Sequence, residues 1–256
     1  MRAILLPGSV MPASIAYADL LAAFDPGVDV RAKELEVYSG ETVPPPGYSL
    51  NTEIDGVDRF ADASGSERFH LVGYSGGGAS ALAYAITKPE RLLSLTLTEP
   101  AWAGVAGRSP EEAAAFDAAI AAISLPPAEM LPAFVRAQLA EGVEPPPMPS
   151  GPPPPWMEVR PAGIRAFPPA FDAFPLSEES LRAFTKPVLF VLGGRSNPNY
   201  FARMAERLGR FFPDFRVEVF DERHHFDPPH RAEPQRYARL LEDHWRRAEG
   251  FSSSPE

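Results

Sequence analysis

Short apolar runs alternate with amphipathic stretches along most of this 256-residue chain. Each run is four to six residues long, and turn-forming or charged residues follow it. Between the runs, apolar side chains recur at helical spacing, as they do at Tyr17, Leu20, Leu21 and Phe24. This alternation predicts an α/β fold with a doubly wound, mostly parallel sheet of about six strands. The predicted strands lie at residues 3–6, 35–38, 69–74, 93–98, 188–192 and 216–220.

The alternation stops between about residue 101 and residue 186. Two Ala-rich stretches in this part, 111–123 and 128–140, have the pattern of helices, and a Pro-dense run follows at 144–155. No strand pattern occurs there. We therefore predict a single domain over residues 1–256 that contains a mostly helical insertion at about 101–186.

The charge balance limits the partners of this chain. It has 24 basic and 34 acidic residues and a formal net charge of −10, which disfavours nucleic acid and anionic membrane surfaces. No stretch of 18 uncharged apolar residues predicts a membrane span. The first apolar run is too short for a signal-peptide core, so we expect a cytoplasmic protein. The chain has no cysteine, which excludes disulfides, a cysteine nucleophile and thiolate metal sites. The oligomeric state stays open.

The strongest chemical signal is the segment Gly73-Tyr74-Ser75-Gly76-Gly77. It directly follows a predicted strand and directly precedes a helical stripe, which is the context of a nucleophile elbow. Flanking glycines let strand and helix approach closely, and a serine at a helix N-terminus lies where developing negative charge is favoured. The alternatives are a glycine-rich turn or a phosphate cradle. The chain contains neither G-x-G-x-x-G nor G-K-[ST], which disfavours a nucleotide site.

Four segments together resemble the alpha/beta hydrolase family. Residues 69–77 resemble that family's strand and elbow, and residues 5–9 resemble its first strand and oxyanion loop. Residues 192–198 resemble the loop that usually supplies the acid, and residues 224–226 resemble the histidine loop that precedes the final helix at Pro234. The insertion then corresponds to the family's variable cap. Two features depart from the family: the two strands that often open the sheet are missing, and Asn197 stands where an aspartate is expected.

The resemblance implies that a histidine after the last strand is the general base. His225, directly before Phe226, fits the family spacing best, and His224 is the alternative. The base takes the proton of the Ser75 hydroxyl and returns it to the leaving group. Of the other histidines, His70 is expected in the core, His230 on a loop and His244 at the surface.

The acid that supports the histidine has more than one candidate. Asn197 could orient an imidazole but supplies no charge. Glu99 follows a predicted strand directly, and some alpha/beta hydrolases draw their acid from this strand end. We therefore expect Glu99 to be the acid. The other readings are that Glu99 is a wall residue or a partner of the cap, or that Asp221, Asp227 or another acid takes the role.

Backbone N–H groups of Ser9 and Gly76 are the expected oxyanion hole, because Pro7 has no N–H to donate. Tyr74, Trp102 and Trp156 are expected to contact the substrate, although the aromatic residues of the insertion could instead pack the core of the cap. His225, Asp227 and His230 could also be ligands of a metal site. This hypothesis is disfavoured, since proline stiffens the loop and no second ligand cluster exists. We expect neither a metal nor a cofactor.

These expectations describe a serine hydrolase that cleaves a carboxylic ester of a small or medium apolar substrate through an acyl-enzyme. Its partner would be a small molecule. The alternatives are a thioesterase, a lyase that uses the same serine and histidine, and a catalytically silent ligand-binding protein of the same fold.

Overall fold

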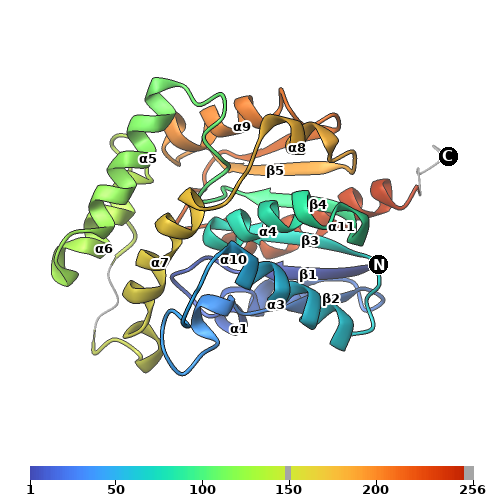
Figure 1. Cartoon of the computed structure of the whole chain (residues 1–256), viewed down its shortest axis with the longest axis horizontal. Coiled ribbons are helices and arrows are strands. Elements are labelled where there is room, and N and C mark those ends of the chain that lie inside the picture. The colour runs from blue at the N-terminus through green and yellow to red at the C-terminus, as the bar shows by residue number, and fades with distance from the viewer. Residues whose placement is uncertain (148–150, 251–256) are drawn as a thin grey trace.

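A six-stranded parallel sheet forms the centre of the computed structural model, which describes residues 1–147 and 151–250 (Figure 1). The strand order is β2-β1-β3-β4-β5-β6, and every neighbouring pair is parallel. The predicted fold class is therefore confirmed. The strands are β1 (Arg2–Leu6), β2 (Asp29–Ala32), β3 (Phe69–Tyr74), β4 (Leu92–Thr98), β5 (Val188–Gly193) and β6 (Phe215–Phe220).

Helices cover both faces of the sheet because successive strand residues point to opposite sides. In β1, Ile4 and Leu6 belong to the core cluster shared with α3 (Leu50–Ala63) and α4 (Ser75–Thr87). Ala3 and Leu5 belong to the cluster shared with α2 (Ala18–Ala23) and α11 (Pro234–Ala248). Both clusters are apolar and buried, so each layer of helices is fixed to the sheet by hydrophobic packing. The other helices before β4 or after β5 are α1 (Ala13–Ala16), α9 (Arg203–Leu208) and α10 (Pro229–Ala232).

The strand predicted at 35–38 is wrong. The second strand is β2, and residues Glu36–Tyr38 form a 3-10 turn. The carboxylate of Glu53, on α3, accepts hydrogen bonds from the backbone N–H groups of Glu36 and Val37 at 2.9 and 3.0 Å. A side chain therefore satisfies the donors that a neighbouring strand would otherwise bind.

Between β4 and β5 the described residues form four helices: α5 (Pro110–Ile123), α6 (Pro127–Ala137), α7 (Arg160–Asp172) and α8 (Glu178–Ala183). The first two match the predicted helices, except that α6 ends earlier than expected, and the other two were not predicted. Figure 1 shows α5, α6 and α7 together at one end of the sheet. A buried ion pair ties α5 to α9, since Arg207 Nη2 lies 2.6 Å from Glu112 Oε1.

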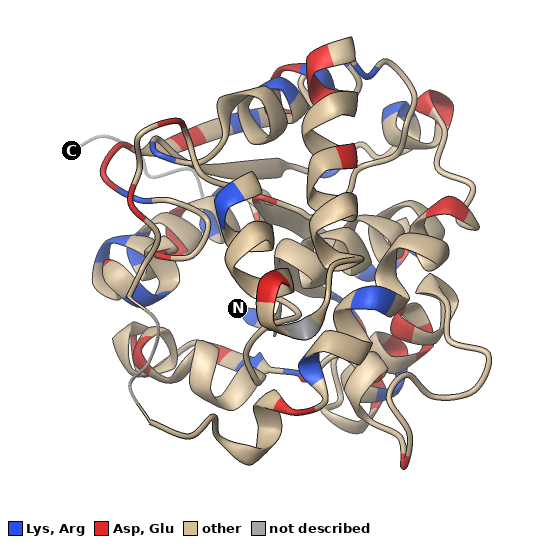
Figure 2. Ribbon diagram, turned by 90° about the vertical axis from the view of Figure 1, so that its left-hand side faces the viewer, with Lys and Arg blue, Asp and Glu red and all other residues tan. Residues whose placement is uncertain are grey.

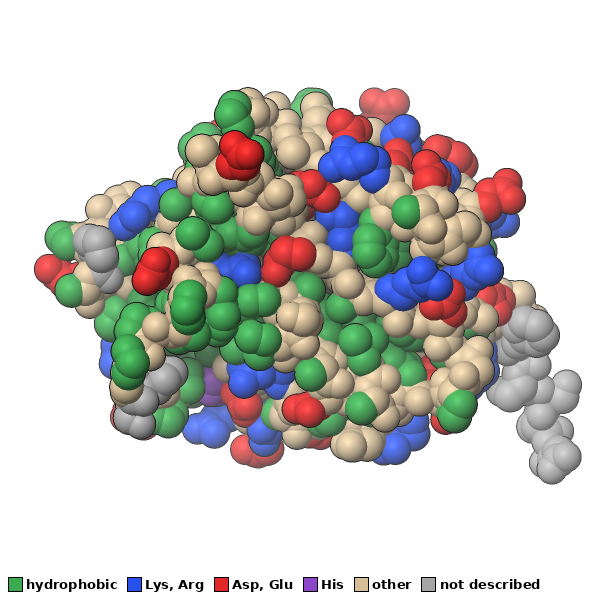
Figure 3. All heavy atoms as spheres, turned by 90° about the horizontal axis from the view of Figure 1, so that it is seen from below, with side chains coloured by type: hydrophobic (Ala, Val, Ile, Leu, Met, Phe, Trp, Pro, Cys, Tyr) green, Lys and Arg blue, Asp and Glu red, His purple; other side chains and the backbone are tan. Residues whose placement is uncertain are grey.

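The surface carries both charge signs and scattered apolar side chains. Acidic and basic residues are interspersed over the helices in Figure 2. Seen from below, hydrophobic side chains gather on the left, the side on which Figure 1 shows α6 and α7 (Figure 3). Within residues 1–147 and 151–250, none of the helices has the length and apolar composition that crossing a bilayer would need.

Candidate active site

Ser75 lies at a sharp turn where β3 passes directly into α4. Its φ of +52° is in the left-handed region, which is unfavourable for a residue with a side chain. The turn needs glycine on both sides. An ideal Cβ on Gly73 would lie 2.3 Å from the carbonyl oxygen of Gly77, and one on Gly77 would lie 2.3 Å from that of Pro7. The glycines thus allow the backbone contacts that hold the Ser75 hydroxyl at the end of the sheet.

Three predicted residues form one continuous hydrogen-bonded row. The Ser75 Oγ lies 3.1 Å from His225 Nε2, and His225 Nδ1 lies 3.0 Å from Glu99 Oε2. If Nδ1–H donates to the carboxylate, Nε2 is left to accept the hydroxyl proton of Ser75. All three residues are buried, at 6%, 1% and 2% exposure for Ser75, His225 and Glu99. This arrangement can transfer a proton away from the serine while it attacks an electrophile.

The carboxylate and the imidazole are both fixed by further contacts. Glu99 follows β4 directly with φ +42°, and its Oε1 accepts a hydrogen bond of 2.8 Å from the N–H of Gly193, at the end of β5. The ring of Phe201 stacks on that of His225, with centroids 4.7 Å apart and planes at 11°. His224 Nδ1 accepts from two N–H groups of the turn that presents His225. The imidazole therefore has little freedom to rotate away from Ser75.

The other candidate residues for the acid lie elsewhere. The amide of Asn197 donates to the carbonyl of Ala137 at 2.8 Å and accepts from the N–H of Asn199 at 3.0 Å. Asp227 forms an ion pair with Arg223 at 2.6 Å, and Asp221 is exposed. The two ring nitrogens of His225 bond to Glu99 and Ser75 and to none of these three residues.

Ser9 and Gly76 lie side by side next to Ser75. An ideal Cβ on Gly76 would lie 3.4 Å from the Cβ of Ser9. Gly76 is the second residue of α4, so its N–H has no acceptor within the helix. No hydrogen bond among the described residues uses the N–H of Ser9. The Tyr38 hydroxyl donates to the Ser9 carbonyl and anchors this loop.

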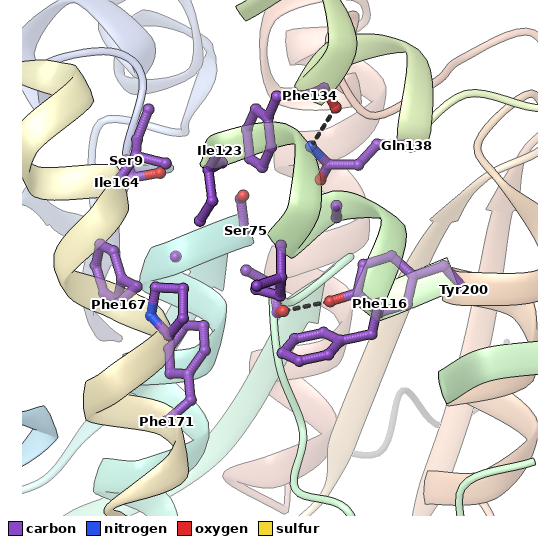
Figure 4. A pocket seen from close by; sticks show the side chains of 15 residues that line it. Ser9, Ser75, Phe116, Ile123, Phe134, Gln138, Ile164, Phe167, Phe171 and Tyr200 are labelled. Carbon is purple, nitrogen blue, oxygen red and sulfur yellow. Dashed lines mark hydrogen bonds between the residues drawn. The ribbon is translucent and has the colours of Figure 1, made fainter. Parts of the chain in front are cut away.

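A first cavity opens beside Ser75 beneath α5, α6 and α7 (Figure 4). It contains about 440 Å³ of space free of protein atoms, its mouth included. Its wall is almost entirely apolar. Apart from Ser9 and Ser75, the polar side chains labelled in Figure 4 are those of Gln138 and Tyr200. The rings and aliphatic side chains that line it include Phe116, Ile120, Ile123, Phe134, Ile164, Phe167 and Phe171.

A second cavity reaches Ser75 from another direction. It contains about 470 Å³ of space, its mouth included, and shares Ser9, Ser75 and Phe134 with the first. Unlike the first cavity, it is lined by His225. The remainder of its wall comes from Gly8, Val10, Met11, Ala16, Tyr74, Phe226, Pro228, His230 and Arg231.

The three predicted substrate contacts differ in position. Tyr74 lines the second cavity, and its hydroxyl donates to the carbonyl of His225. Trp102 and Trp156 line neither of the two cavities. Trp102 is buried behind the first cavity, where it stacks on Phe171 at 5.3 Å, and Trp156 lies beside the guanidinium of Arg160. Both contacts are with residues of α7 (Arg160–Asp172), so these rings pack against the helices between β4 and β5.

The remaining histidines are all buried. His70 is hydrogen-bonded to Ser94 at 2.8 Å inside the sheet, as expected for a core residue. His244, expected at the surface, is only 6% exposed because α11 packs it against the sheet. His230 is buried in α10 rather than on an open loop, and burial together with the positive Arg231 lowers its pKa to about 3.

The three residues considered as metal ligands do not converge on a common point. His225 pairs with Glu99, Asp227 pairs with Arg223, and His230 packs between Tyr17 and Tyr74. Over the part of the chain that the structure describes, no three side chains of the metal-binding types cluster.

Tyr38, Gly193 and Phe201 support the row of Ser75, His225 and Glu99, and the sequence did not single them out. Each contacts a residue at least 24 positions away in the sequence. Tyr38 and Gly193 donate hydrogen bonds to Ser9 and Glu99, and Phe201 stacks on His225. Only Gly193 gave a signal, since Gly193-Gly194 directly follows a predicted strand. The other two contacts depend on tertiary packing that local spacing does not encode.

Comparison with known proteins gives a consistent picture. A model of the alpha/beta hydrolase family matches residues 3–240, whereas no curated protein matches the sequence. A thermophilic esterase from Thermogutta terrifontis superposes with a TM-score of 0.68 at 19% identity, covering 97% of this chain and 90% of that one. A carboxylesterase from Bacillus subtilis gives 0.67 at 17% identity, covering 94% and 82%. A bacterial membrane phospholipase A gives 0.67 at 22% identity, covering 97% and 79%. At these identities the solved structures establish a shared fold.

Proposed function

Because this chain belongs to the alpha/beta hydrolase family, we propose that it is a serine hydrolase that cleaves carboxylic esters of small or medium apolar acids. The observation that carries the proposal is the buried row from Ser75 through His225 to Glu99, with distances of 3.1 and 3.0 Å. A serine, a histidine and a carboxylate in this order are the parts that nucleophilic acyl transfer requires.

In the first half of the reaction, Ser75 Oγ bonds to the carbonyl carbon as its proton moves to His225 Nε2. The imidazolium that forms lies against Glu99, whose negative charge stabilises it in a site with little water. The N–H groups of Ser9 and Gly76 donate to the developing oxyanion. The bond to the alcohol oxygen then breaks, and His225 gives its proton to that oxygen, which leaves as the free alcohol.

In the second half, water enters and His225 removes one of its protons. The hydroxide bonds to the acyl carbon, the bond to Ser75 Oγ breaks, and the proton on His225 returns to the serine. The free acid leaves and the starting state is restored. The cycle uses one water molecule and no cofactor.

The first cavity supports the choice of substrate class. Its apolar, ring-lined wall offers few partners for a polar or charged acid, whereas a hydrocarbon chain would displace water from it favourably. In this proposal the helices between β4 and β5 form a cap on a single domain. The supporting observation is that side chains from α5, α6 and α7 all line that cavity.

The direct test replaces Ser75 by alanine, which removes the attacking oxygen. Hydrolysis of p-nitrophenyl butyrate should fall by at least about 10³-fold, because binding and the oxyanion hole alone remain. The wild-type protein should also be labelled once per chain, at Ser75, by a fluorophosphonate, and intact mass spectrometry would count the labels. Circular dichroism and the unfolding midpoint provide the control for folding.

Two results would contradict the proposal. A folded Ser75→Ala protein that keeps more than about a tenth of wild-type activity would exclude Ser75 as the nucleophile. Wild-type protein that neither turns over activated esters nor reacts with the fluorophosphonate would indicate a silent ligand-binding protein.

A further inference from the structure

Two separate cavities meet at Ser75, and only the second is lined by His225. We infer that the second cavity holds the leaving alcohol of the ester, and that His230 recognises a hydroxyl group on that alcohol. This inference rests on the proposed function and adds to it the chemical class of the alcohol.

The direction of proton transfer assigns the two cavities. The oxygen that leaves the acyl carbon must receive its proton from His225 Nε2, so the alcohol has to depart on the side where His225 faces open space. That side is the second cavity. The first cavity lacks His225 but is lined by Gly76 and by the apolar side chains of α5 and α7, so the acyl chain lies there.

Arg231 in the wall of the second cavity is exposed, whereas His230 is a buried polar group that the first cavity lacks. Its side chain is buried at 1% exposure, and neither ring nitrogen has a hydrogen-bond partner among the described residues. Its ring is packed between those of Tyr17 and Tyr74, with centroids 4.9 and 4.8 Å away. A buried polar group without a partner is unfavourable, and a ligand that supplies the missing hydrogen bonds binds at that point.

The protonation state of His230 fits a hydroxyl group. Burial, Arg231 and His225 all lower the pKa of His230, to about 3, so the ring is neutral at physiological pH. A neutral imidazole donates from one nitrogen and accepts at the other, and a hydroxyl group can complement either. An alkyl alcohol would leave both nitrogens unpaired. The inferred substrates are therefore esters of a small diol or polyol with an apolar acid.

The experiment compares two esters of the same size. 2-Hydroxyethyl butyrate and propyl butyrate share the acyl group and differ in a terminal hydroxyl in place of a methyl. Both give the same acyl-enzyme, so a difference in kcat/KM arises in acylation, while the alcohol is still bound. We expect the wild-type protein to prefer the hydroxyethyl ester by about tenfold, the size of one net hydrogen bond.

Two substitutions at His230 separate recognition from packing. His230→Phe keeps a flat ring but removes both nitrogens, and it should reduce the preference to about twofold or less. His230→Gln keeps one donor and one acceptor and should retain a larger preference than His230→Phe. The ratio of kcat/KM between ethyl hexanoate and ethyl acetate should stay the same in both variants, because the acyl chain lies in the other cavity.

Variants at the two cavities keep the test valid if His230 cannot be replaced without unfolding. Met11→Trp fills only the second cavity and should lower the kcat/KM of butyl acetate relative to methyl acetate. Ile120→Trp fills only the first and should lower that of ethyl hexanoate relative to ethyl acetate. If each variant affects the opposite series, the assignment of the cavities is wrong.

The outcomes for this inference differ from those for the proposed function. If the wild-type protein hydrolyses both butyrates equally and His230→Phe leaves their ratio unchanged, His230 does not recognise the alcohol, although the esterase proposal stands. If the protein hydrolyses no ester and is not labelled at Ser75, the proposed function fails first.

Discussion

Ser75 and Glu99 are the two residues other than glycine that have a positive φ within residues 1–147 and 151–250. Such a backbone conformation costs free energy and persists only where the surrounding structure fixes it. Both residues follow directly after neighbouring strands, β3 and β4, and both contact His225. The two unfavourable turns thus place a hydroxyl and a carboxylate on opposite nitrogens of one ring.

The first prediction at this scale concerns the charge behind His225. Glu99→Gln keeps the shape of the side chain and removes its charge, so kcat for p-nitrophenyl butyrate should fall by at least about 10²-fold. Asn197→Ala, the matched control, should cost less than about tenfold, because Asn197 bonds to Ala137 and Asn199 and not to the imidazole. If Glu99→Gln keeps nearly all of its activity and Asn197→Ala loses most of it, the neutral amide of Asn197 supports His225 in place of Glu99.

The sequence predicted this row of residues because each member directly follows a strand or occupies a recognisable turn. Parallel strands bring their carboxyl ends to one edge of the sheet, so residues 24 or 126 positions away from Glu99 can be expected beside it. Tyr38 and the recognition role of His230 could not be predicted. Their significance depends on which partner is present or missing in the folded protein.

Among the larger elements, α7 presents Ile164, Phe167 and Phe171 to the first cavity. These residues are spaced by three and four positions, which is the helical period. Pro168 and Pro169 within the helix hid that pattern, since proline normally ends a helix. The strand predicted at 35–38 is wrong because burial of Leu35 and Val37 has the period of a strand, whereas Glu36–Tyr38 form a 3-10 turn whose N–H groups bond to Glu53.

The second prediction follows from the position of α7. Phe171→Ala enlarges the first cavity, so the ratio of kcat/KM for p-nitrophenyl hexanoate and acetate should change by at least about fivefold, within the 1–3 kcal/mol that a hydrophobic pocket discriminates per methylene. Trp156→Ala is the matched control, since Trp156 lies outside that cavity and its removal should leave the ratio within about twofold. Equal effects of the two variants would indicate that Phe171 acts only in packing the insertion.

At the scale of the whole molecule, burial of neutral histidines couples folding to pH. His70, His230 and His244 are 0%, 1% and 6% exposed, and burial is the main cause that lowers the pKa of each to about 3. In the unfolded chain a histidine has a pKa near 6.5. The folded and unfolded states therefore bind different numbers of protons between about pH 3 and pH 6.5.

The third prediction is that lowering the pH destabilises the fold already at pH values well above those at which carboxylates titrate. Well above pH 6.5 the three histidines are neutral in either state and add no pH dependence. Below it, the unfolded chain takes up three protons that the folded chain does not, so the free energy of unfolding falls by about 1.4 kcal/mol per pH unit for each histidine. The loss from pH 7.5 to 5.0 should be about 6 kcal/mol, measurable by urea unfolding followed by circular dichroism. His244→Leu should remove about a third of this loss, because it removes one of the three titrating groups. The same loss in the variant and the wild-type protein would show that other groups cause the acid sensitivity.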